Sequence, residues 1–248
     1  MSSLLPHGIA LPAAAEAASL NERYGERSAA ELLELAICRL FLGQIALVSS
    51  FGIESAALLA LVADIDPATP VIFLDTGQLH EETLAYRDLL IARLGLKDVR
   101  SVTPDQAALA REDPEKWLWH DDPDRCCHLR KVAPLEDALR PFAAWITGRK
   151  RYQGGARGRL QAFEADAAGR IKLNPLVSWK PAEITDFLAA RDLPPHPLRE
   201  RNFLSVGCIP CTRAVRQGED ARAGRWPLHA KTECGIHLPP GVSEHAIP

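Results

Sequence analysis

Twice in its N-terminal half the chain runs from a short apolar segment through a polar turn into a helical pattern. Strands that alternate with helices predict an α/β fold, in which right-handed crossovers wind a parallel sheet. Ligands of such sheets gather at the carboxyl ends of the strands, and both polar turns lie there. The two units comprise residues 45–48, the turn Ser49-Ser50-Phe51-Gly52 and residues 54–63, then residues 71–74, the turn Asp75-Thr76-Gly77 and residues 81–94.

Further segments extend this pattern on both sides. Residues 28–42 form an amphipathic helix that opens with a Ser28/Glu31 capping box. Strands are expected at 99–102, 143–147 and 171–173, and a helix is expected to begin near Lys180-Pro181. Proline and glycine become frequent after residue 193, where the periodicity fades. We therefore expect an α/β core over residues 1–193 and a loop-rich extension over residues 194–248, working as one functional unit.

Charge and hydropathy exclude several classes of protein. The net charge of −3 provides no overall attraction to nucleic acid or to an anionic membrane surface. No apolar run approaches the roughly 18 to 20 residues that a membrane-spanning helix needs. The N-terminus lacks a basic start and a continuous apolar segment, so an export signal is not predicted. We expect a cytoplasmic protein that binds neither membranes nor nucleic acid.

Four of the six cysteines fall in two tight pairs, Cys126-Cys127 and Cys208-Ile209-Pro210-Cys211. In the reducing cytoplasm such a set is not expected to form disulfides. Four thiolates fit either an iron–sulfur cluster or a zinc ion. Adjacent cysteines favour the cluster, because structural zinc sites space their ligands by two to four residues.

The remaining two cysteines differ in their surroundings. Cys234 stands near the C-terminus with Lys231 and His237 beside it, and nearby cations favour the nucleophilic thiolate. It is either a reactive cysteine on a mobile tail or an exposed cysteine without a role. Cys38 lies in the apolar stripe of its predicted helix, which indicates a small buried core residue.

Two features could bind an anion. The turn at 49–52 precedes a helix and could offer backbone N–H groups, although it lacks the lysine of a P-loop. Several guanidinium groups together would suit a ligand with two acidic groups. For any single arginine, a position on a solvated basic face is the simpler interpretation. The basic residues that follow the sheet are Arg149, Lys150, Arg151, Arg157, Arg159, Arg222 and Arg225.

Taken in order, these segments resemble the phosphoadenylyl- and adenylyl-sulfate reductases of assimilatory sulfate reduction. The resemblance runs from about Gln44 to His237 and implies the adenine-nucleotide α-hydrolase-like fold. Its signatures are Ser49-Ser50-Phe51-Gly52, Leu74-Asp75-Thr76-Gly77, Cys126-Cys127 followed by Arg130-Lys131, Ile146-Thr147-Gly148-Arg149, Asn174-Pro175-Leu176, Gly207-Cys208-Ile209-Pro210-Cys211-Thr212, Gly224-Arg225-Trp226, and the tail from Lys231 to His237.

The resemblance implies a reaction in two stages. The Cys234 thiolate attacks the sulfur of a sulfonucleotide, AMP leaves, and an S-sulfocysteine remains. Thioredoxin or glutaredoxin then releases sulfite by thiol exchange. His237 matches a family histidine near the nucleophile, and we hypothesise that it tunes the thiol.

The resemblance also assigns the other site residues. A [4Fe–4S] cluster that polarises the site would be bound by Cys126, Cys127, Cys208 and Cys211, with Lys131 between cluster and substrate. The nucleotide would be held by Ser49, Ser50, Phe51, Gly52, Leu74 and Gly148. Its phosphate–sulfate end would meet Arg157, Arg222 and Arg225.

The paired cysteines favour adenylyl sulfate as substrate, because members that use the 3′-phosphorylated form usually lack them. Some cluster-bearing members accept both. Tyr152 and Gly154-Gly155 depart from the family pattern in the loop before Arg157. One rival interpretation is an ATP pyrophosphatase or a tRNA-thiolating enzyme, although residues 50–55 differ from the loop that is typical of those enzymes. The other is a zinc-stabilised binding module. The oligomeric state stays open, and a homo-oligomer is compatible with the sequence.

Overall fold

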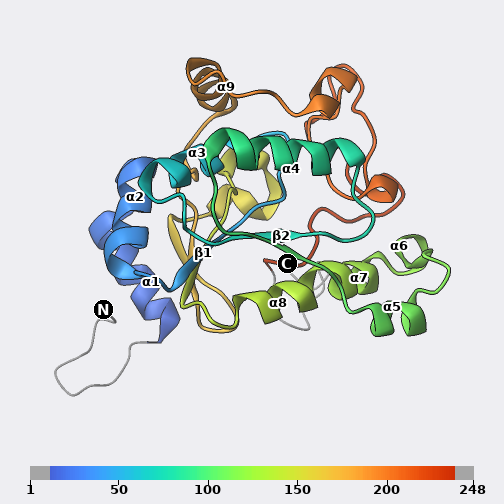
Figure 1. The fold of residues 1–248 in the computed structure, drawn as a ribbon, viewed down its shortest axis with the longest axis horizontal. Coiled ribbons are helices and arrows are strands. Elements are labelled where there is room, and N and C mark those ends of the chain that lie inside the picture. The colour runs from blue at the N-terminus through green and yellow to red at the C-terminus, as the bar shows by residue number, and fades with distance from the viewer. Residues whose placement is uncertain (1–11, 238–248) are drawn as a thin grey trace.

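The computed structural model describes residues 12–237 of the chain. Its centre is a six-stranded sheet in the order β3-β2-β1-β4-β6-β5 (Figure 1). Neighbouring strands are parallel except at one edge, where β5 runs antiparallel to β6. The strands are β1 Ile45–Val48, β2 Val71–Leu74, β3 Val99–Val102, β4 Ala144–Ile146, β5 Phe163–Ala165 and β6 Ile171–Leu173. The predicted α/β fold with a parallel sheet is confirmed.

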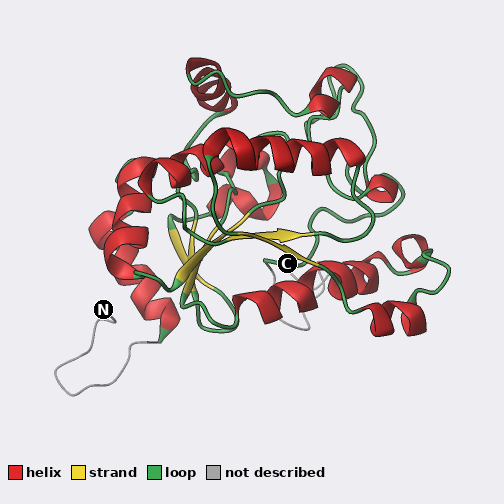
Figure 2. Cartoon of the chain, in the orientation of Figure 1, coloured by secondary structure: helices red, strands yellow, loops and turns green. Residues whose placement is uncertain are grey.

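Helices cover both faces of this sheet (Figures 1 and 2). Residues of α1, α2, α3, α4 and α9 contribute to the large core on one face, whereas α8 packs against β2 and β3 on the other. The helices are α1 Ala13–Tyr24, α2 Ala29–Leu35, α3 Ser55–Ile65, α4 Glu81–Leu94, α5 Gln106–Glu112, α6 Leu118–Asp121, α7 Pro123–Cys127, α8 Ala133–Leu139 and α9 Pro181–Ala190. Shorter turns are η1 Ala36–Leu40, η2 His128–Val132, η3 Arg151–Gln153, η4 Gly155–Arg159, η5 Pro197–Arg201 and η6 Ile209–Cys211.

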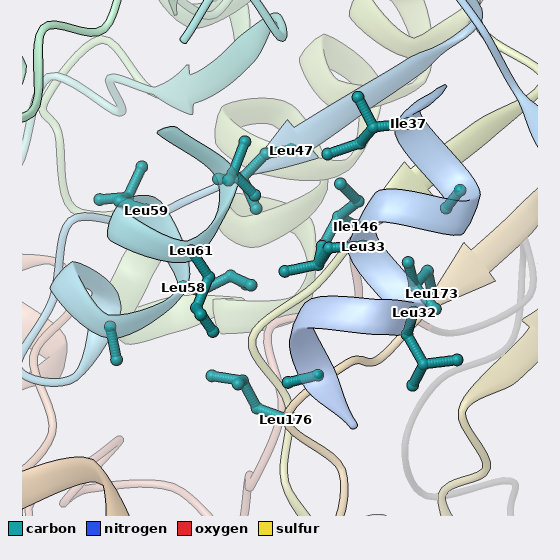
Figure 3. Close-up of a cluster of buried hydrophobic side chains, with 14 of the residues drawn as sticks. Leu32, Leu33, Ile37, Leu47, Leu58, Leu59, Leu61, Ile146, Leu173 and Leu176 are labelled. Atoms are coloured by element: carbon teal, nitrogen blue, oxygen red, sulfur yellow. The ribbon is translucent and has the colours of Figure 1, made fainter. Parts of the chain in front are cut away.

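The apolar strands are buried on both faces, as expected of parallel strands between two helical layers. Side chains alternate along each strand. Leu47 and Ile146 face the larger core, where Leu33 of α2 and Leu58 of α3 meet them (Figure 3). Ala46, Ile72 and Trp145 face the smaller core beneath α8. The carboxyl ends of β1, β2 and β4 therefore lie at one edge between the two layers.

The predicted helix over residues 28–42 forms with its capping box, but it does not continue as an α-helix. Ser28 accepts from the backbone N–H of Glu31, whose carboxylate accepts from Ser28 in turn. After Leu35 the chain forms the π-turn η1. A π-turn contains an extra residue and so shifts the phase of the apolar stripe. Cys38 is consequently exposed, and its prediction as a core residue was wrong.

The sequence patterns did not indicate α1, β5 or the run of short helices from α5 to α8. Beyond α9, the described residues up to 237 form only 3₁₀ turns and isolated bridges, which confirms the loop-rich character expected of this segment. Residues 238–248 of the predicted extension lie outside the described residues. Within residues 12–237 no helix is both long and apolar enough to cross a bilayer.

Candidate functional site

A cavity of about 300 Å³ lies at the carboxyl ends of β1, β2 and β4. Its wall brings together polar turns after these strands, basic residues and the C-terminal tail, which are far apart in the sequence. The predicted site residues in the wall are Ser49, Ser50, Gly52, Leu74, Lys131, Gly148, Arg157, Arg222, Arg225, Cys234 and His237. Phe51 and the four paired cysteines are not among the lining residues.

The turn after β1 is held by its own hydroxyl groups. The N–H of Phe51 donates to Ser49 Oγ at 3.2 Å, and the N–H of Gly52 donates to Ser55 Oγ at 2.9 Å. Phe51 has a positive φ of 48°, and its buried ring contacts Phe73 edge-on. Two amides that could have met an anion are therefore satisfied within the turn. The charge of an anionic ligand would therefore be offset mainly by side chains elsewhere in the wall.

Glu54, which the sequence patterns did not single out, organises the loop after β4. Its carboxylate accepts from Lys150 Nζ at 2.8 Å and from the Tyr152 hydroxyl. Lys150 is buried, and burial lowers its pKa despite the opposing effect of Glu54. Tyr152, a departure from the family pattern, thus has a partner in the cavity wall. This loop leads into η4, which contains Arg157.

Arg225 is fixed by the backbone of the C-terminal segment. Its Nη1 donates to the Val206 carbonyl at 3.1 Å, and its guanidinium lies over the Trp226 ring at 4.6 Å. Gly207 permits this placement, because a Cβ there would lie 2.3 Å from Arg225 Nη2. The guanidinium therefore reaches the cavity wall in a defined orientation.

Ion pairs hold the tail around Cys234. Lys231 pairs with Asp124 of α7. Glu233 accepts from Arg157 at both carboxylate oxygens, from Nε at 2.5 Å and from Nη2 at 2.8 Å. Burial raises the pKa of Glu233, but Arg157 and Arg222 more than offset this and hold it below its usual range. Glu233 is thus ionised at neutral pH, and Cys234 beside it is directed to the cavity wall.

His237 stacks on Trp145 of β4, with ring centroids 5.3 Å apart and an interplanar angle of 2°. Trp145 is itself fixed, because its Nε1 donates to Asp166 Oδ2 at 3.0 Å. Burial lowers the pKa of His237 well below its usual value, and the cations of Arg149 and Lys172 lower it further. The imidazole is therefore neutral at pH 7, and its evident contact is the stack that anchors the tail.

This stack leads to a prediction that distinguishes two roles of His237: anchoring the tail and tuning the Cys234 thiol. An aromatic pair contributes about 0.5–1.5 kcal/mol beyond area burial, so His237→Ala should lower kcat/KM by up to about tenfold. His237→Phe preserves the stack and should retain most of the wild-type value. Steady-state turnover by both variants, in the sulfite-forming reaction that the resemblance implies, is the measurement. Equal losses in the two variants would show that the imidazole nitrogens are required.

The four paired cysteines are free thiols that are buried and do not line the cavity. Cys126 and Cys127 close the short helix α7, whose first turn is capped by Asp122 accepting from Arg125 N–H at 2.8 Å. Cys208 forms an isolated bridge with Leu79, and its Sγ lies 3.2 Å from Thr76 Oγ1. The loop after β2 therefore binds the Cys-x-x-C segment.

Burial and neighbouring charges shift the pKa values of these thiols in different directions. Burial raises the pKa of Cys126 to about 12, and the charge of Cys127 adds to this. Burial raises the pKa of Cys208 too, but Lys131 and the hydrogen bond from Thr76 more than offset it, so the net shift is downward. The thiolates of Cys208, Cys127 and Cys234 in turn raise the pKa of Lys131 in spite of its burial. Lys131 therefore stays charged, and it lines the cavity together with Cys234.

A buried ion pair fixes this arrangement. Arg130 donates to Asp113 at 2.5 Å and to the Thr76 carbonyl at 2.9 Å, and both charged side chains are buried. Arg130 lies in the π-turn η2, between the adjacent cysteines and α8. Arg130 therefore joins the segment that contains Cys126, Cys127 and Lys131 to the end of α5 and to the loop after β2.

The donor set suits an iron–sulfur cluster. Within residues 12–237 no three Cys, His, Asp or Glu side chains are arranged to hold a single metal ion. In a cluster each thiolate binds an iron of its own, so the four sulfurs need not converge on one point. Four buried, unpaired thiols in mutual electrostatic contact, beside a lysine that offsets negative charge, fit such a group.

Residues 44–214 match the family model described as phosphoadenosine phosphosulfate reductase domain. An adenosine 5′-phosphosulfate reductase of Mesorhizobium japonicum is 51% identical over 225 residues, which cover 91% of this chain and 88% of the relative. A phosphoadenosine 5′-phosphosulfate reductase of Gloeobacter violaceus is 38% identical, with 87% of this chain and 91% of the relative covered.

Solved structures share the fold at lower identity. Phosphoadenylyl-sulfate reductase from Candida auris superposes with a TM-score of 0.68 at 21% identity, covering 86% of this chain and 98% of that one. The FMN adenylyltransferase of Candida glabrata gives a TM-score of 0.54 at 16% identity, covering 95% of this chain and 86% of that one. At these sequence identities, both similarities show a shared fold and nothing more.

Proposed function

Because the chain belongs to the phosphoadenosine phosphosulfate reductase family, we propose that it is an adenosine 5′-phosphosulfate reductase whose nucleophile is Cys234. It is an enzyme that acts on a sulfur group. The observation that carries the proposal is the cavity, in which Cys234, Lys131 and three predicted arginines share one wall with the polar turns after β1 and β4.

In the first step the Cys234 thiolate attacks the sulfonate sulfur. An S–S bond forms, the bond from sulfur to the bridging phosphate oxygen breaks, and AMP takes the electron pair. Arg157, Arg222 and Arg225 would stabilise the phosphate as negative charge develops on it. Lys131 lines the same cavity as Cys234 and would offset negative charge that the nucleotide brings there.

In the second step a reduced dithiol protein, a thioredoxin or glutaredoxin, attacks the S-sulfocysteine. Sulfite leaves, and the partner is oxidised to its disulfide when its second thiol resolves the mixed disulfide. The two electrons that reduce the sulfur thus come from the dithiol. A reaction that consumes dithiols belongs in a reducing compartment, consistent with the expected cytoplasmic location.

A [4Fe–4S] cluster bound by Cys126, Cys127, Cys208 and Cys211 would supply fixed charge beside the cavity, and no electron transfer through it is needed. Its cysteine set is the feature that favours the unphosphorylated nucleotide. The alternative substrate, 3′-phosphoadenylyl sulfate, is supported by the Gloeobacter violaceus relative, so an enzyme that accepts both is the second candidate.

The function is tested by anaerobic sulfite production with reduced thioredoxin. We expect kcat/KM for adenosine 5′-phosphosulfate to exceed that for the 3′-phosphorylated analogue by at least about tenfold. This is the loss expected when a charged group, here the 3′-phosphate, is bound without a suitable partner. Comparable rates would establish dual specificity. No sulfite from either nucleotide, on protein with its iron and sulfide intact, would refute the proposed reaction.

A further inference from the structure

Glu233 occupies a position in the cavity that an anionic ligand would also require. Its carboxylate meets Arg157 in a two-point contact, which is the geometry in which guanidinium groups also bind phosphate and sulfate. Arg222 Nη2 lies 3.5 Å from the same carboxylate. Glu233, Arg157 and Arg222 all line the cavity, and each side chain is at most 20% exposed.

We infer that Glu233 is a placeholder for an acidic group of the substrate, which displaces the carboxylate from Arg157 and Arg222 on binding. This inference rests on the proposed function, because that function supplies a ligand with a phosphate and a sulfonate. A buried anion beside an ionised Glu233 would meet like charge in surroundings that screen it weakly. Exchange of one anion for the other keeps both guanidinium groups paired.

The exchange links substrate binding to the position of the nucleophile. Cys234 follows Glu233 directly, so release of the carboxylate removes one contact beside the thiol, while Lys231 still pairs with Asp124. On the other side the tail stays anchored by the stack of His237 on Trp145. The Cys234 sulfur can then shift towards the bound sulfonate while the tail remains in the cavity.

The test compares the binding of AMP and adenosine to the full-length, anaerobically purified wild type and Glu233→Gln by calorimetry. Because Glu233→Gln removes the competing charge, its dissociation constant for AMP should be about tenfold lower than that of the wild type, which corresponds to one charge-assisted contact. The dissociation constant for adenosine should stay within about twofold of the wild-type value. Glu233→Ala should behave in the same way. Glu219→Gln is the matched control, because Glu219 pairs with Arg213 and does not line the cavity.

Each outcome decides the question. Unchanged or weaker AMP binding in folded Glu233→Gln, with sulfite formation by the wild type intact, would overturn the placeholder role alone. An equal gain for adenosine would also overturn it, since a loosened cavity does not discriminate by charge. A wild-type enzyme that neither binds AMP nor forms sulfite would overturn both this inference and the proposed function.

Discussion

Cys234→Ser is expected to bind adenosine 5′-phosphosulfate almost as tightly as the wild type and to form sulfite at least about 10³-fold more slowly. Binding should persist because the turns and arginines of the cavity wall are untouched by this change. The rate should collapse because a serine hydroxyl is essentially un-ionised at neutral pH, even beside Lys131. Calorimetric binding and anaerobic sulfite assays provide the two measurements.

A covalent readout sharpens the test. Without a thiol partner, the wild type mixed with substrate should gain one sulfonate on the peptide that contains Cys234, as seen by mass spectrometry, and Cys234→Ser should gain none. Cys38→Ser is the matched control, because Cys38 is exposed and lies outside the cavity wall. Normal sulfite formation by Cys234→Ser would refute the mechanism.

Local patterns predicted the central part of the fold from sequence. The strands β1 and β2 were predicted residue by residue, because each is an apolar run bounded by polar or turn-forming residues. The helix α4 was predicted with its correct bounds, and Gly95 ends it in the left-handed conformation that glycine favours. These features depend on near neighbours in the chain, which a sequence displays directly.

The π-turns were not predictable in this way. The turn η1 exposes Cys38, and η2 places Arg130 and Lys131 next to the adjacent cysteines. A single extra residue in a helix has no distinct composition, although it changes which side chains face the core. Helical periodicity therefore fails at these two places, and one of them lies at the candidate site.

The partners of the site residues were also hidden from the sequence. Glu233 was not identified, although Arg157 was, because 32 acidic and 29 basic residues allow many pairings. Likewise, the contact of His237 with Trp145 joins the tail to β4. Such pairs arise from tertiary packing, and the sequence alone shows only that charged and aromatic groups are present.

If the proposed cluster is bound, Cys208→Ser is expected to lose most of the iron and acid-labile sulfide and at least about 100-fold in sulfite formation. Cys208 is buried, contacts Thr76 and is the cysteine whose charge most raises the pKa of Lys131, a residue of the cavity wall. Serine at this position would offer a poor ligand to iron. Iron, sulfide and zinc are measured per chain on anaerobically purified protein, alongside the activity.

Cys38→Ser again serves as the control, and it should keep both its iron and its activity because Cys38 is exposed on η1 and does not line the cavity. The metal content distinguishes the rival interpretations independently of activity. Full iron and sulfide in Cys208→Ser would remove this residue from the ligand set. Zinc without sulfide in the wild type would instead favour a structural ion, because a zinc site contains no inorganic sulfide. In that case the charge beside the cavity would have to come from Lys131 and the arginines alone.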